Sequence, residues 1–262
     1  LQSVNTSVAV ADAYSLAATS GRFDLSAAFE LHAGDRIVFS TDQQATITSG
    51  QGMSIGAQAL GVTANQMHTT VSGNAVLEAD TMTIATSTSY GLSSSGDLDL
   101  AAENFKISAG SSTLTAASSM VMNASNLEFN VVDRATLAAT TLVSSTASTA
   151  IDATDSLRMS SRLISTTADD YEASISGGAV VNASSINLNG AESMLLDTSS
   201  FRLRTSTSDV EVAEGFSVGA NSILLNSEDS VSIRSDRRLD VEAADSVFSA
   251  ANTSLWTSNH SA

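Results

Sequence analysis

Two residue types are absent from the 262-residue chain: cysteine and proline. Without cysteine no disulfide can form, and the redox compartment stays open. Proline makes up about 5% of an average soluble protein. It is excluded from the interior of paired strands because it has no backbone N–H to donate. Its absence therefore predicts a chain in which nearly every segment lies in a hydrogen-bonded ladder.

Aromatic residues are also scarce, at 5% of the chain with a single tryptophan, Trp256. The apolar fraction of 42% is inflated by alanine, so a wide globular core would lack its usual large side chains. This composition predicts a narrow core with one or two modest side chains per strand. No apolar run reaches the ~18 residues of a membrane-spanning helix. The N-terminal residues lack the basic and apolar regions of a signal peptide, so none is expected.

Positive charge is the third shortage, because one lysine and ten arginines accompany 28 acidic residues, for a net charge of −17. Phosphate backbones are bound by clustered basic residues, so nucleic acid is not an expected partner. The acidic residues are spread from Asp12 to Asp245. They predict a solvating surface that resists aggregation, with a cation-binding surface as the alternative.

Apolar residues recur in pairs separated by one residue, as in Leu98/Leu100 and Phe105/Ile107. Spacing by two residues is that of a strand with one face turned inward, whereas a helix needs apolar residues at i, i+3, i+4 and i+7. The second members and two lone apolar residues follow one another in steps of seven or eight: Leu100, Ile107, Leu114, Met122, Phe129 and Leu137. The pattern predicts short strands, each followed by a corner.

The same pattern assigns the inward-facing core. It has no member with a catalytic, cofactor or metal role, and its residues are structural. The predicted core positions are Leu98, Leu100, Phe105, Ile107, Leu114, Met120, Met122, Leu127, Phe129, Leu137, Ile186, Leu188, Met194, Leu196, Phe201, Leu203, Val210, Val212, Phe216, Val218, Ile223, Leu225, Val231, Ile233, Leu239 and Val241.

The pattern also divides the chain. Residues 1–20 are the least periodic and are predicted to be a capping or linking segment. Residues 21–250 are predicted to form one continuous β-helical repeat array, and residues 251–262 a C-terminal tail. Within the array, residues 140–178 fit the repeat only with slips, which predicts a β-bulge or a change of register there.

Two windings fit an all-β solenoid of this repeat. In a single-chain three-sided β-helix, three units make a coil of about 22–23 residues, and the rod is about 50 Å long. In an intertwined homotrimeric triple-stranded β-helix, each unit is one side of the triangle, and the rod is about 150 Å long. The spacings of the eight phenylalanines show no sustained 22–23-residue recurrence. The sequence therefore favours the homotrimer, with the single-chain helix as the alternative.

Two stretches resemble known repeat families. They are LDLAAENFKISAGSSTLTAASSMVMNAS, from Leu98 to Ser125, and SVSIRSDRRLDVEAADSVFSA, from Ser230 to Ala250. Both look like sarcoglycan repeats, and both are similar to the trimeric needles of phage tails and type VI secretion spikes. The resemblance is one of pattern and covers roughly residues 21–250. It implies short strands from three chains intertwined into a rod.

No constellation in the sequence predicts catalysis. The histidines are His32, His68 and His260, and no HExxH, CxxC, GxSxG or GxGxxG motif accompanies them. Nucleophilic and metal sites need convergent ligands, so we expect neither an enzyme nor a bound cofactor. Three acidic pairs are the candidates for a cation: Asp97/Asp99, Asp169/Asp170 and Glu228/Asp229.

These observations predict a structural protein. The chain is interpreted as a rigid rod segment of an extracellular or cell-surface fibre. It is expected to self-associate as a homotrimer and end to end into a filament. A membrane-puncturing or delivery spike is one alternative, because it would share the rod and differ at the tip. An adhesion module is another, and it would need a patch of outward aromatic residues or regular threonines.

Overall fold

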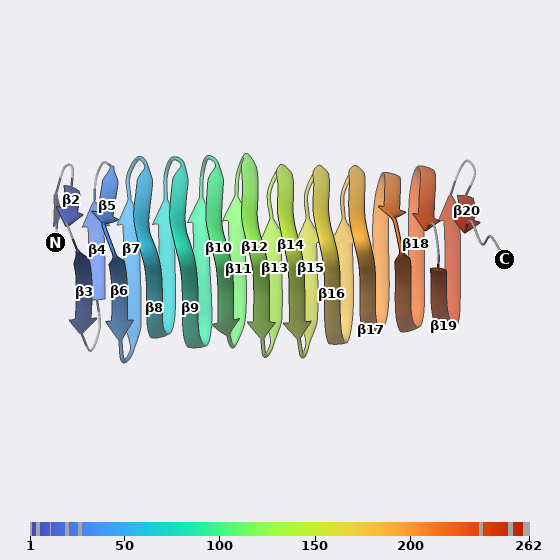
Figure 1. The fold of residues 1–262 in the computed structure, drawn as a ribbon, viewed down its shortest axis with the longest axis horizontal. Coiled ribbons are helices and arrows are strands. Elements are labelled where there is room, and N and C mark those ends of the chain that lie inside the picture. Colours follow the sequence, from blue (N-terminus) through green and yellow to red (C-terminus); the bar gives the residue numbers. More distant parts are fainter. Residues whose placement is uncertain are drawn as a thin grey trace.

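The structure is a computed structural model, and it describes residues 2–3, 6–10, 12–18, 21–25, 28–235, 238–250 and 254–258. These residues form a parallel β-solenoid of about 10 turns that contains no helix. The turns stack from the N-terminal end of a rod to its C-terminal end, and the two termini lie at opposite ends (Figure 1). The predicted all-β solenoid is thus confirmed.

Twenty strands make up the stack. In the N-terminal half they are β1 (Gln2–Ser3), β2 (Thr6–Val10), β3 (Ala13–Ala18), β4 (Gly21–Leu25), β5 (Phe29–Ala33), β6 (Arg36–Thr41), β7 (Gln44–Ser49), β8 (Met53–Val71), β9 (Ala75–Ser94) and β10 (Leu98–Ala109). In the C-terminal half they are β11 (Ser111–Ala116), β12 (Ser119–Val131), β13 (Arg134–Ala138), β14 (Thr141–Ala153), β15 (Ser156–Ser160), β16 (Leu163–Asn182), β17 (Ser185–Val212), β18 (Gly215–Ser235), β19 (Arg238–Ala250) and β20 (Ser254–Ser258).

Each coil has three straight sides. In the coil that begins at Leu98, side 1 is residues 98–102, side 2 is residues 104–109 and side 3 is residues 111–116. Strand β10 bends between sides 1 and 2, where Glu103 falls out of the pairing. The names side 1, side 2 and side 3 apply to the stacked segments of every coil.

The chain pairs with itself in parallel at a spacing of 22 to 24 residues. Leu98 pairs with Ala75 in one neighbouring coil and with Met120 in the other. Phe29 pairs with Met53 and Gly21 pairs with Ala45, and these steps of 24 residues are the longest in the described chain. The spacing within the chain is close to the coil length of the single-chain winding. At about 4.8 Å between coils, about 10 turns give a rod about 50 Å long.

The bore of the solenoid is filled by the inward residues of all three sides. The side chains of Leu98, Ile107 and Leu114, one from each side of a coil, have no exposed surface. The rings of Phe105 and Phe129 meet edge to face at 6.0 Å between centroids. Burying one such side chain stabilises the fold by about 1.5–3 kcal/mol, so the stack depends on many equal contributions.

The predicted core positions all face this bore. From Leu98 to Leu137 every one of them is buried, and so are most of the positions between Ile186 and Ile233. Five are half-buried and pack against the core from the C-terminal half: Leu188, Leu196, Phe201, Leu239 and Val241.

Hydroxyl side chains link successive coils at the corners. The Ser227 Oγ lies 2.8 Å from the carbonyl oxygen of Ser206, in the coil before, and 3.1 Å from that of Ser230, in its own turn. Ser235 makes the same two contacts with Glu214 and Arg238. The single hydroxyl proton can be donated to either of the two carbonyl oxygens. A buried hydroxyl at a corner therefore provides a hydrogen-bond donor for backbone carbonyls that face the core.

The irregular stretch at residues 140–178 has two causes in the structure. Register shifts occur between Ala168 and Asp170 and between Ile175 and Gly178, which confirms the predicted change of register. Hydroxyls also replace apolar side chains inside the bore. The hydroxyl oxygens of Thr146 and Thr149 lie 2.6 Å apart and pair with each other there.

Strand pairing extends into the two terminal segments. Strand β2 pairs with β5 and β3 pairs with β6, within the residues 1–20 for which the sequence predicted a cap or linker. At the other end β20 pairs with β18, within the predicted tail of residues 251–262. The described parts of both segments therefore continue the stack.

Candidate functional site

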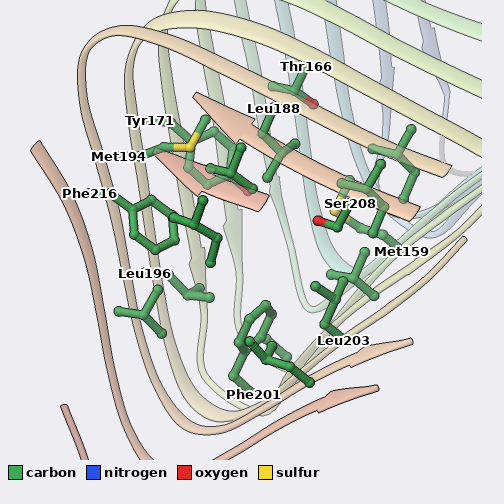
Figure 2. Close-up of a pocket in the computed structure, with 18 of the residues that line it drawn as sticks. Met159, Thr166, Tyr171, Leu188, Met194, Leu196, Phe201, Leu203, Ser208 and Phe216 are labelled. Atoms are coloured by element: carbon green, nitrogen blue, oxygen red, sulfur yellow. The ribbon is translucent and has the colours of Figure 1, made fainter. Parts of the chain in front are cut away.

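An apolar cavity of about 110 Å³ occupies the bore in the C-terminal half. Figure 2 shows its three walls, one from each side of the solenoid. Side 1 contributes Thr166, Leu188 and Ser208, and side 3 contributes Phe201 and Leu203. Side 2 contributes a stacked row: Tyr171, Met194 and Phe216.

The cavity has little chemistry to offer. No carboxylate, imidazole or amine occurs among its described lining residues. An apolar cavity of about 150 Å³ stays dry and admits a molecule the size of benzene, so this one accommodates nothing larger. It marks the region where the half-buried Leu188, Leu196 and Phe201 leave the bore loosely filled.

Ser208, in the side 1 wall of the cavity, is a residue whose replacement should stabilise the fold. Its side chain is 3% exposed, its hydroxyl has no hydrogen-bond partner in the described chain, and it stacks on Val231 in the next coil. A buried hydroxyl without a partner costs about 1–3 kcal/mol. We expect Ser208→Val to raise the free energy of unfolding by about 1–2 kcal/mol, measured by urea unfolding. Ser227→Val, which removes a bonded corner hydroxyl, is the matched control and should lower it.

Two tyrosines of the bore, the buried Tyr90 and the half-buried Tyr171, predict a loss of stability at alkaline pH. Burial raises the pKa of Tyr171 to about 12 and the pKa of Tyr90 further above its usual value near 10. The folded state therefore holds these protons after the unfolded chain has released them, so their contribution is complete below pH ~10 and is lost as the pH rises toward the folded pKa. Each tyrosine should lower the free energy of unfolding by at most about 1.4 kcal/mol per pH unit in that window. Urea unfolding at pH 9, 10 and 11 measures the slope, which Tyr90→Phe should reduce.

The histidines are kept apart and serve the packing of the coils. The imidazole of His32 lies against Gly56, where a Cβ would come within 2.7 Å of Nδ1. His68 lies in the same way against Gly91, at 2.8 Å. His260 falls outside the described residues. Among the residues that the structure describes, no group of three or more histidine, aspartate or glutamate side chains is arranged to hold a metal.

One carboxylate of each acidic pair accepts a hydrogen bond from a neighbouring coil. Asp97 accepts a hydrogen bond from the N–H of Ser119 at 3.1 Å, and Asp170 accepts one from the Ser193 hydroxyl at 2.7 Å. Glu228 accepts one from the hydroxyl of Ser206 at 3.0 Å. Each bond joins residues 22 or 23 apart, so these carboxylates act as links between coils in the structure.

The outer surface is divided by charge. The strand segments of side 3 between Gln44 and Ser227 contain no carboxylate, although some segments of sides 1 and 2 carry acidic residues, such as Asp99 on side 1 and Asp152 on side 2. Side 3 instead presents serine, threonine and four exposed arginines: Arg134, Arg158, Arg202 and Arg204. The sequence alone does not group these arginines, because Arg158 and Arg202 are 44 residues apart and become neighbours only once the coil length is known.

Comparison of the chain with protein-family models, with curated proteins and with solved structures finds no match. None of the described residues belongs to a helix long and apolar enough to cross a bilayer.

Proposed function

We propose that the chain is a rigid rod segment of an extracellular or cell-surface fibre. The observation that supports this best is the unbroken parallel ladder of about 10 turns around an apolar bore. Backbone hydrogen bonds between coils run along the rod axis, so bending the rod means stretching a row of them. The same ladder leaves few exposed peptide bonds unpaired for a protease to enter.

The fibre is proposed to grow by association of copies end to end. A strand edge with free N–H and C=O groups is a template for another strand. Copies stacked end to end would continue the ladder and lengthen the fibre by about 50 Å each.

The lateral assembly is proposed to be a homotrimer. Each chain pairs with itself at a spacing of 22 to 24 residues. This favours a trimer of three complete prisms that stand side by side over a trimer in which three chains share each coil. The number of copies stays a prediction. Sedimentation equilibrium measures it directly, and a mass that stays at one chain across the accessible concentrations would contradict the trimer.

Imaging of single particles tests the rod. We expect rods about 50 Å long at low concentration, and filaments whose lengths increase in steps of about 50 Å at high concentration. A variant that blocks one end should leave the short rods and abolish the filaments. Ile223→Pro in β18 is a matched control inside the stack, where a missing N–H should disrupt the rod itself. Particles that are short, round and indifferent to concentration would contradict the proposal.

A further inference from the structure

The four exposed arginines of side 3 form a compact group. Arg158 pairs with Val180, and Val180 pairs with Arg202, so two coil steps of about 4.8 Å each separate the two arginines. Arg134 pairs with Ser156, at the start of the strand that carries Arg158, and Arg204 follows Arg202 on the same outward face. We name Arg134, Arg158, Arg202 and Arg204 the basic patch.

These arginines have no ion-pair partner among the described residues, in a chain rich in acids. Ion pairs do form elsewhere on the rod. Lys106 contacts Glu128 at 2.7 Å on side 2, and Arg238 contacts Asp240. The strand segments that carry the basic patch contain no carboxylate, and the nearest acids in the sequence, Asp133 and Asp155, stand at the corners before β13 and β15.

The complementary surface lies on side 2 of the same coils. Asp152, Asp170, Glu172 and Asp197 are exposed there on three successive strand segments, and we name them the acidic patch. Asp152 and Asp197 both align with Ser174 in the coil between them. The acidic segment 193–197 leads directly into the basic segment 200–204, so both patches lie at one level of the rod.

Each patch also has an apolar centre. Leu195, 39% exposed, lies between Ser193 and Asp197 and stacks on Glu172 in the acidic patch. In the basic patch, Arg202 is flanked by Val180 in one neighbouring coil and by Leu224 in the other. Apolar centres with a charged rim are the anatomy of protein–protein interfaces.

We propose that side 3 of one copy docks on side 2 of a neighbouring copy, with the basic patch against the acidic patch and Leu195 against Val180 and Leu224. This lateral contact rests on the proposed function as a fibre segment and names its partner, a second copy of this chain. The acids of a second copy repeat at the same coil spacing of about 4.8 Å as the arginines. A polyanionic glycan would match the arginines and would have no use for Leu195.

Sedimentation velocity of charge-reversed variants tests the contact. Wild-type protein should self-associate at low ionic strength and dissociate in about 0.5 M salt, where exposed charges are screened. Arg158→Glu/Arg202→Glu should weaken association at least about tenfold. The matched control is Arg36→Glu/Arg234→Glu, which makes the same change of net charge at exposed arginines outside the patch and should associate as wild type does.

Mixing two reversed variants gives a second, independent measurement. Glu172→Arg/Asp197→Arg should also remain dissociated alone, because its two docking sides are both basic. An equimolar mixture with Arg158→Glu/Arg202→Glu should associate again, since each docking side then meets one of opposite charge. Circular dichroism of each variant establishes that the outward substitutions leave the strands intact.

Several results would overturn the docking. Wild type that stays one chain at every salt concentration, a control that dissociates as far as the patch variant, or a mixture that fails to associate would each do so. A heparin column that retains wild type but not Arg158→Glu/Arg202→Glu, without self-association, would identify a polyanion as the partner instead. Filaments of the patch variant in images would leave the fibre function standing, so the two failures are distinguishable.

Discussion

Leu100→Asp is expected to abolish the fold of the rod. Leu100 is 2% exposed in the bore and stacks between Leu77 and Met122. The substitution loses about 1.5–3 kcal/mol of apolar burial and leaves a carboxylate in a site with no positive charge, at an effective cost of several kcal/mol. The sum is comparable to the 5–15 kcal/mol by which ordinary domains are stable. Circular dichroism should show loss of the strand signal at neutral pH.

The neighbouring position supplies the control. Ala101 is next in the strand and faces outward, so Ala101→Asp places the same charge on the other face. Its effect should stay within about 0.5 kcal/mol. Phe105→Asp, on side 2 of the same coil, should behave as Leu100→Asp does. Normal cooperative unfolding of Leu100→Asp would show that this residue is not in the bore.

Gly177→Ala is the second substitution with a large expected effect. Gly177 occupies a corner, where a Cβ would fall on the carbonyl oxygen of Asp155 in the coil before. That oxygen accepts the hydrogen bond from the N–H of Gly178 at 3.1 Å. Relief of the overlap must move backbone on both coils, so we expect a loss of about 2–4 kcal/mol in the free energy of unfolding, measured by urea unfolding.

A second glycine serves as the control for Gly177→Ala. It shows the effect of an added methyl group where no backbone of a neighbouring coil lies close. Gly215 begins β18, and a Cβ there would meet no atom within 4 Å. Gly215→Ala should therefore be neutral or stabilise the rod by up to about 1 kcal/mol, because alanine restricts the unfolded chain. Equal losses for the two variants would contradict the account of the corner.

The side of the coil could be predicted from sequence because alternation is a local property. The pair Leu98/Leu100 already gives the strand, its inward face and its length to the next corner. The coil length could not be found from phenylalanine, because inward positions accept any side chain of similar volume. Phe105 stacks on Met82 in one coil and on Leu127 in the next, so phenylalanine does not recur at the coil spacing.

The basic patch and the acidic patch could not be predicted from the sequence, for a related reason. Arg158 and Arg202 become neighbours only after the chain is folded back at a known coil length, and the phenylalanine spacings did not give that length. The cavity in the bore could not be predicted either, because the half-buried Leu188 and Leu196 fit the apolar pattern as well as fully buried residues do. Alternation gives the direction of a side chain, whereas the filling of the bore depends on all three walls at once.

Stacking at a constant step makes the rod modular. Each coil contacts only the coils before and after it, as in other repeat proteins. Met120 and Leu142 occupy the same position in adjacent coils. Removing residues 120–141 would therefore join Ser119 to Leu142 with every later side chain still facing its original side. The length of this rod is thus a variable that gene duplication or deletion can change by one layer at a time, without redesign of the coils that remain.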